Sequence, residues 1–116
     1  MSLIADRVSP TFKRVVKVRF ITDGGTVYEA SITAGFKRLD NDAVQELLER
    51  EPTNREILEE VLDFVEGISS KDGEAWPADA QKEWAMKTRE TVNALALDFL
   101  LAYDQTGSVK TSRKQR

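Results

Sequence analysis

The alternation of apolar and polar residues in the first third of the chain predicts a β-hairpin. In Lys13–Thr22, apolar side chains alternate with basic ones, which is the period-two pattern of a half-buried strand. A second alternating run, Thr26–Phe36, has five apolar residues on one face: Tyr28, Ala30, Ile32, Ala34 and Phe36. Between the runs, TDGGT contains residues that tolerate the positive φ of tight hairpin turns. Because two strands alone are marginally stable, we expect helices to cover the apolar face.

Two helix starts follow the hairpin. The run LDNDAVQELLER places Asp40 or Asn41 at an N-cap and ends before Pro52. The sequence TNRE, starting at Thr53, is a capping box for a second helix. We expect this second helix to extend to Gly67, with the glycine as its left-handed C-cap.

The C-terminal part of the chain predicts one long helix. Trp76-Pro77 opens it, since a proline in the first helical turn loses no hydrogen bond. No glycine or proline interrupts the chain from Ala78 to about Gln105, which gives roughly 40 Å of helix at 1.5 Å per residue. The expected fold is therefore α+β, with a two- or three-stranded antiparallel sheet packed on three helices, the last being the longest.

The last helix is apolar on more than one side. One stripe with helical spacing suits a core: Val92, Leu95, Ala96, Phe99, Leu100 and Tyr103. Ala94, Leu97, Leu101 and Ala102 fall largely outside that stripe. A domain of this size buries only about two-thirds of its unfolded surface. We therefore expect one side of the helix to face its own core and part of the other to contact a partner. The alternative is a central core helix without a partner.

Four residues are the candidate partner contacts: Trp76, Trp84, Leu97 and Leu101. The two tryptophans are eight residues apart and so lie on roughly the same side of a helix. Tryptophan is favoured both in cores and at interface hot spots, so core packing is the alternative for this pair. The exposed apolar surface that we expect on the helix also predicts a homo-oligomer.

Composition and charge indicate a soluble globular chain. Of 116 residues, 41% are hydrophobic and 32% are charged, with a net charge of −3. We expect a lead-in over residues 1–12, a single domain over 13–105 and a flexible basic tail over 106–116. No apolar run is long enough for a membrane span or a signal peptide, so a cytoplasmic protein is expected.

The residue types present argue against several kinds of chemistry. The chain has neither histidine nor cysteine, and so lacks the usual proton shuttle, thiol nucleophile and thiolate metal ligand. We predict no enzymatic activity, no cofactor and no metal site. Asp40, Asp42 and Glu46 are close in sequence, but no glycine bend accompanies them, which favours helix capping over calcium binding.

The charges are unevenly distributed along the chain. The segment Asp40–Glu66 has ten acidic and two basic residues, whereas Gly107–Arg116 has four basic residues and no acidic one. Such a tail would bind nucleic acid weakly and in a salt-sensitive manner, so nucleic acid is not an expected partner. The basic residues of the first strand suit edge protection. The alternative is a basic face for an acidic partner or nucleic acid.

The order of these signals resembles that of the tail assembly chaperones of long-tailed bacteriophages and prophages. The resemblance covers roughly residues 13–105. It rests on AGFKRL at Ala34–Leu39, on VLDFVEGI at Val61–Ile68, on the turn containing Asp72-Gly73 and on the final apolar helix. The family often has tryptophan where this chain has Phe64, and we expect the aromatic packing to be retained.

The resemblance implies a non-catalytic factor that binds the tape measure protein and keeps it soluble until tail tube subunits polymerise around it. Such a factor would act in the bacterial host cytoplasm and be absent from the mature virion. The alternative is a structural virion protein, such as a minor tail protein or a tail terminator. A small nucleic-acid-binding regulator is a third possibility.

Overall fold

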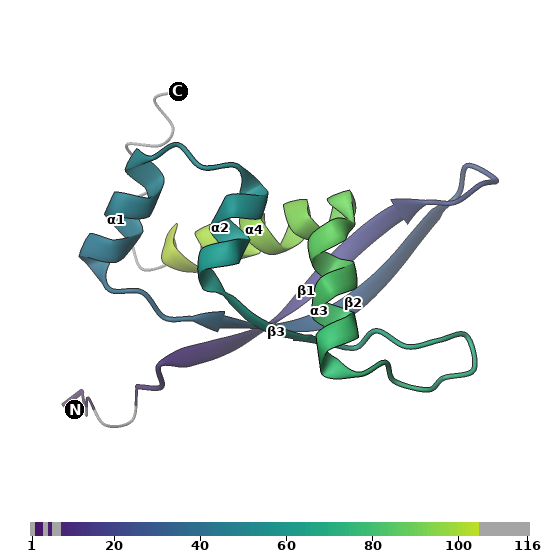
Figure 1. Ribbon diagram of the computed structural model, residues 1–116, viewed down its shortest axis with the longest axis horizontal. Coiled ribbons are helices and arrows are strands. Elements are labelled where there is room, and N and C mark those ends of the chain that lie inside the picture. Colours follow the sequence, from purple (N-terminus) through teal and green to yellow (C-terminus); the bar gives the residue numbers. More distant parts are fainter. Residues whose placement is uncertain (1, 4, 6–7, 105–116) are drawn as a thin grey trace.

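The computed structural model describes residues 2–3, 5 and 8–104, and the predicted tail, 106–116, lies outside them. Three antiparallel strands in the order β1-β2-β3 are packed with four helices, of which the last is the longest (Figure 1). This arrangement confirms the predicted α+β fold class. The elements are β1 (Thr11–Ile21), β2 (Val27–Lys37), α1 (Asn41–Glu49), α2 (Asn54–Val61), β3 (Leu62–Glu66), α3 (Ala78–Lys87) and α4 (Arg89–Asp104).

The predicted hairpin is present as β1 and β2. Val16 pairs with Ile32, and the pairing continues without a shift from Thr11 to Ile21. At the turn, the Thr22 amide donates to the Thr26 carbonyl at 2.8 Å. Strand β1 starts two residues before the predicted Lys13, inside the expected lead-in. The end of the hairpin extends beyond the helices, so its tip is open to solvent (Figure 1).

The helix predicted to end at Gly67 ends earlier. Its start is confirmed, because Thr53 and Glu56 form the capping box. However, α2 stops at Val61, and the next five residues form β3. The reason is tertiary: Val65 and Phe64 pair with Ala34 and Gly35, which satisfies backbone groups that β2 would otherwise leave open. Gly67 does have a positive φ of 105°, but it follows a strand and caps no helix.

The predicted single helix from Ala78 to Gln105 is also wrong, since the chain breaks at Thr88. That residue has φ −99° and ψ 123°, an extended conformation that separates α3 from α4. The break allows α3 to pack on β3 while α4 packs on α2 and β1.

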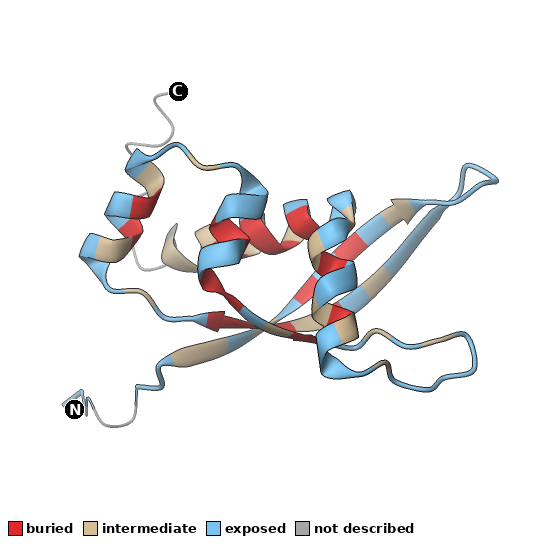
Figure 2. Cartoon of the chain, in the orientation of Figure 1, coloured by how far each residue is buried: buried red, intermediate tan, exposed pale blue. Residues whose placement is uncertain are grey.

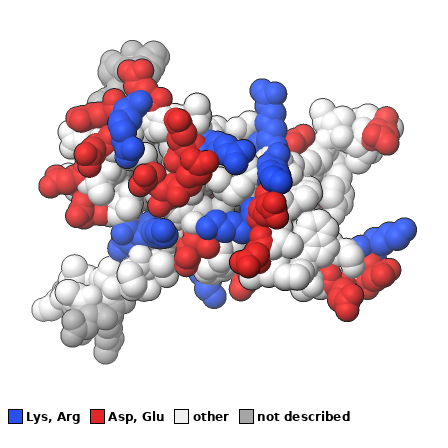
Figure 3. Space-filling view, in the orientation of Figure 1, with Lys and Arg blue, Asp and Glu red and all other residues white. Residues whose placement is uncertain are grey.

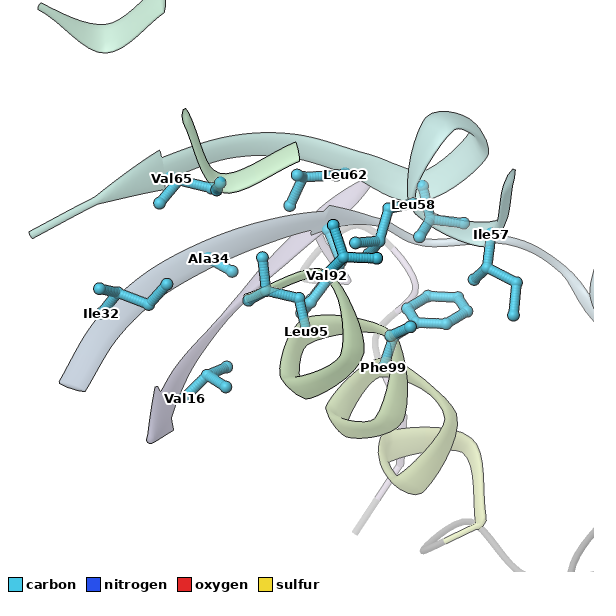
Figure 4. Packing of buried hydrophobic residues seen from close by; sticks show 14 of the residues in the cluster. Val16, Ile32, Ala34, Ile57, Leu58, Leu62, Val65, Val92, Leu95 and Phe99 are labelled. Carbon is cyan, nitrogen blue, oxygen red and sulfur yellow. The ribbon is translucent and has the colours of Figure 1, made fainter. Parts of the chain in front are cut away.

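The core lies between one face of the sheet and the helices (Figure 2). Val92, Leu95 and Phe99 of α4 point toward the strands (Figure 4).

Asp40 caps α1, because its carboxylate accepts from the Ala43 amide at 2.8 Å. This confirms the capping role predicted from the sequence.

An ion pair at the edge of the core joins α4 to β1. Arg14 donates to Asp98 through Nε at 2.6 Å and through a terminal nitrogen at 3.2 Å. Both side chains are largely shielded from solvent. Because the Asp98 carboxylate accepts these hydrogen bonds, it raises the pKa of Arg14. This bidentate contact fixes the position of α4 relative to β1.

Candidate protein-binding surface

The two predicted tryptophan contacts meet beside α3, with Trp76 in the loop before the helix and Trp84 in its second half. The rings of Trp76 and Trp84 have centroids 6.4 Å apart and are nearly perpendicular, an edge-to-face arrangement that aromatic pairs prefer. Trp76 is half-buried, and the side chain of Trp84 is 37% exposed. Each ring therefore contributes to packing and also presents surface to solvent.

The tryptophans continue into two further rings from the hairpin. Trp84 contacts Phe20 of β1 at 6.2 Å, and Phe20 contacts Tyr28 of β2 at 6.3 Å between centroids. The order Tyr28, Phe20, Trp84, Trp76 thus forms a continuous aromatic row across the hairpin and α3. Tyr28 is 58% exposed. Partly exposed aromatic side chains held in fixed positions are typical of the centres of protein interfaces.

A buried glutamine holds the tryptophan end of this row. Gln81 is 6% exposed, and its side-chain oxygen accepts from the Ile68 amide at 2.9 Å. Its side-chain nitrogen donates to the Trp76 carbonyl at 2.7 Å. The Trp76 amide in turn donates to the Ile68 carbonyl at 3.1 Å. Gln81 therefore joins both ends of the loop between β3 and α3 to the helix, which positions Trp76 beside Trp84.

The predicted leucine contacts lie on α4. Leu97 and Leu101 are one helical turn apart and are 57% and 43% exposed, whereas Phe99 between them is fully buried. The alternative in which α4 is enclosed by its own chain therefore does not hold for these two leucines. Whether they contact a partner stays a prediction.

The four predicted contacts come from different elements of the fold. The tryptophans belong to the aromatic row, and the leucines belong to a separate helix beyond the Thr88 break. Sequence reasoning missed Phe20 and Tyr28, because both lie on the face of the hairpin that was expected to be covered. Their position beside the turn was the available signal, since the end of a long hairpin can extend past the helices that cover it.

The two signatures that carry the family resemblance lie side by side in the sheet. Gly35 pairs with Phe64, and the Phe64 ring covers the glycine. Lys13 places its ammonium group 5.7 Å from the centre of the same ring. The expected aromatic packing at Phe64 is therefore present, and glycine makes room for it. These signatures therefore account for strand pairing in the sheet. The aromatic row is made by other residues.

Acidic side chains gather over α1 and α2 (Figure 3). The hairpin has exposed charged side chains of its own, among them Lys17 and Arg19 of β1 and Glu29 of β2. A groove of about 340 Å³ between these helices is lined by Leu47, Arg50, Pro52, Glu56, Glu59 and Glu60. Within the described part of the chain, no group of three potential metal ligands is close enough to hold an ion. Apolar partners are therefore better matched to the aromatic row than to this groove.

Comparison with known proteins gave no match among protein-family models, curated proteins or solved structures. Among the helices of the described residues, none combines the length and apolar character needed to cross a bilayer.

Proposed function

We propose that this protein is a non-catalytic tail assembly chaperone of a long-tailed bacteriophage or prophage. It binds the tape measure protein and keeps it soluble until tail tube subunits polymerise around it, and it does so in the host cytoplasm. The observation that carries the proposal is the aromatic row, a set of partly exposed rings shared by the hairpin and α3. The family resemblance supplies the identity of the client.

The chemistry of the row suits reversible binding. Four rings, each partly packed against its own chain, offer apolar contact without a large dry interface. Because the rings are already held in place, little side-chain entropy is lost when a client binds. A client with regularly spaced apolar side chains would be covered, and later displacement by tube subunits would remain possible.

The first test is co-expression with a tape measure protein encoded by the same genome. Tyr28→Ser and Trp84→Ser are expected to lower the soluble fraction of that client by severalfold, because each removes a ring from the row. The matched control is Val15→Ser, since Val15 is 71% exposed but lies outside the row. Urea denaturation of each variant shows that the fold is retained. A wild-type protein that leaves client solubility unchanged would overturn the proposal.

The second test separates a chaperone from a structural virion protein. Quantitative mass spectrometry of purified particles is expected to detect tape measure and tube proteins, with this protein absent. Its presence at a fixed number of copies per particle would instead identify a minor tail protein or a tail terminator.

A further inference from the structure

Helix α3 is held to the rest of the protein by few buried side chains. Only Gln81 and Ala85 of α3 are buried. Helix α4, in contrast, buries a longer apolar stripe: Val92, Leu95, Ala96 and Phe99. Elements with little buried apolar surface open at lower free energy than the core of a domain. When α3 separates, it therefore loses less buried apolar surface than α4 would, together with the hydrogen bonds of Gln81 and Trp76 to Ile68.

The junction between the two helices is a single residue. Helix α3 ends at Lys87, α4 begins at Arg89, and only Thr88 between them is extended. Both the amide and the hydroxyl of Thr88 donate to the Trp84 carbonyl, at 3.1 and 2.9 Å. The sequence across the junction contains neither glycine nor proline, so the same residues are able to form a continuous helix.

A buried hydroxyl stabilises the bent form of the junction. Thr91 is 1% exposed, and its hydroxyl lies 2.6 Å from the Ala85 carbonyl oxygen and 2.8 Å from that of Thr88. In a continuous helix the Ala85 carbonyl would accept from the Arg89 amide, four residues later. The Thr91 hydroxyl thus supplies a bond to this carbonyl in the bent form, and the straight form does not need it.

The aromatic row joins α3 to the hairpin. Trp76 and Trp84 belong to α3 and its preceding loop, whereas Phe20 and Tyr28 belong to the hairpin. The contact between Phe20 and Trp84 is the only link between these two pairs among the ring contacts of the described residues. Any movement of α3 away from the sheet therefore divides the row at its centre.

We infer that α3 is a hinged element that rotates about Thr88. In the bent form it assembles the aromatic row, and in the straight form residues 78–104 make one helix and the row is divided. A client that contacts both halves binds the bent form more tightly and so stabilises it. Opening of the hinge then releases the client. The release role rests on the proposed function, whereas the hinge itself does not.

Hydrogen exchange of Thr91→Val tests the hinge in the free protein. Valine keeps the shape of threonine but leaves the buried Ala85 carbonyl without its hydroxyl donor, which penalises only the bent form. We expect the amides of α3 to exchange about 5- to 150-fold faster, measured relative to those of α4, since an unsatisfied buried carbonyl shifts an equilibrium by about this factor. The control is Thr22→Val, which removes a hydroxyl from the distant hairpin turn. Equal exchange of α3 and α4 in both proteins would overturn the hinge.

Spin-label distances distinguish a straight helix from an unfolded one. The chain has no cysteine, so labels at Asp79→Cys and Leu97→Cys are unambiguous. A continuous helix separates these backbone positions by about 27 Å, and the bent form brings them closer. We expect Thr91→Val to increase the population at the longer distance. A broad distribution or an unchanged single distance contradicts the proposal. Neither result depends on client solubility, so failure of the hinge and failure of the chaperone function are distinguishable.

Discussion

Replacing Phe99 by alanine is expected to lower the free energy of unfolding by about 3–5 kcal/mol. The ring is fully buried and contacts the rings of Phe36 and Tyr103 at centroid distances of 5.4 and 5.0 Å. Phe12 stacks on it from β1 at 6.4 Å. Truncation therefore removes apolar contacts with the sheet and with α4 itself, and it leaves a cavity that a close-packed core cannot fill. Urea denaturation followed by tryptophan fluorescence measures the loss.

The matched controls lie on the other side of the same helix. Leu97→Ala and Leu101→Ala are each expected to change the free energy of unfolding by less than about 0.5 kcal/mol, because both side chains are substantially exposed. Their predicted effect is on association, measured by light scattering and by client capture. If both variants fold normally and neither self-association nor client binding weakens, the assignment of these leucines as contacts is wrong.

Gly35→Ala is expected to lower the free energy of unfolding by about 1–3 kcal/mol, the usual penalty for overpacking a core. A Cβ atom at this position would lie 2.6 Å from the Cζ atom of Phe64, well inside van der Waals contact. The ring would have to rotate away, which would also end its contact with Lys13. The cost is a matter of space, because Gly35 is not among the glycines with a positive φ. Chemical denaturation gives its size.

Two comparisons make the cause of this effect testable. Gly24→Ala is the control, since a Cβ atom there meets nothing within 4 Å, and we expect little change. In a Phe64→Ala background the clash is absent, so Gly35→Ala should then cost much less. An equal cost in both backgrounds would show that the glycine is needed for some other reason than room for the ring.

The proposed function depends on the aromatic row, whereas the hinge does not. The chaperone function requires that all four rings be available to a client, which the exposure of Tyr28 and Trp84 supports. The hinge requires only that α3 be weakly held and that Thr91 stabilise the bend. A protein with the function and without the hinge would bind its client but release it by competition alone.

Local residue patterns determined much of this protein. Alternation in Lys13–Thr22 and Thr26–Phe36 specified the hairpin, because one face had to be apolar. Asp40 and Thr53 specified two helix starts, because their side chains accept hydrogen bonds from backbone amides that have no partner within the first helical turn. Residues 91–103 have apolar side chains on two sides of the helix. This pattern correctly indicated that Leu97 and Leu101 would be exposed while Phe99 was buried.

Only the tertiary structure decided that residues 62–66 form a strand and that the C-terminal helix breaks at Thr88. Both segments have residues compatible with helix, so their sequence alone favoured its continuation. The open edge of β2 turned the first into a strand, and packing on two different parts of the sheet bent the second at Thr88. The aromatic row is likewise a tertiary feature, since its rings come from strands and a helix far apart in sequence. Local patterns report which backbone conformations a segment tolerates, whereas the choice among them depends on backbone groups and apolar surfaces contributed by distant residues.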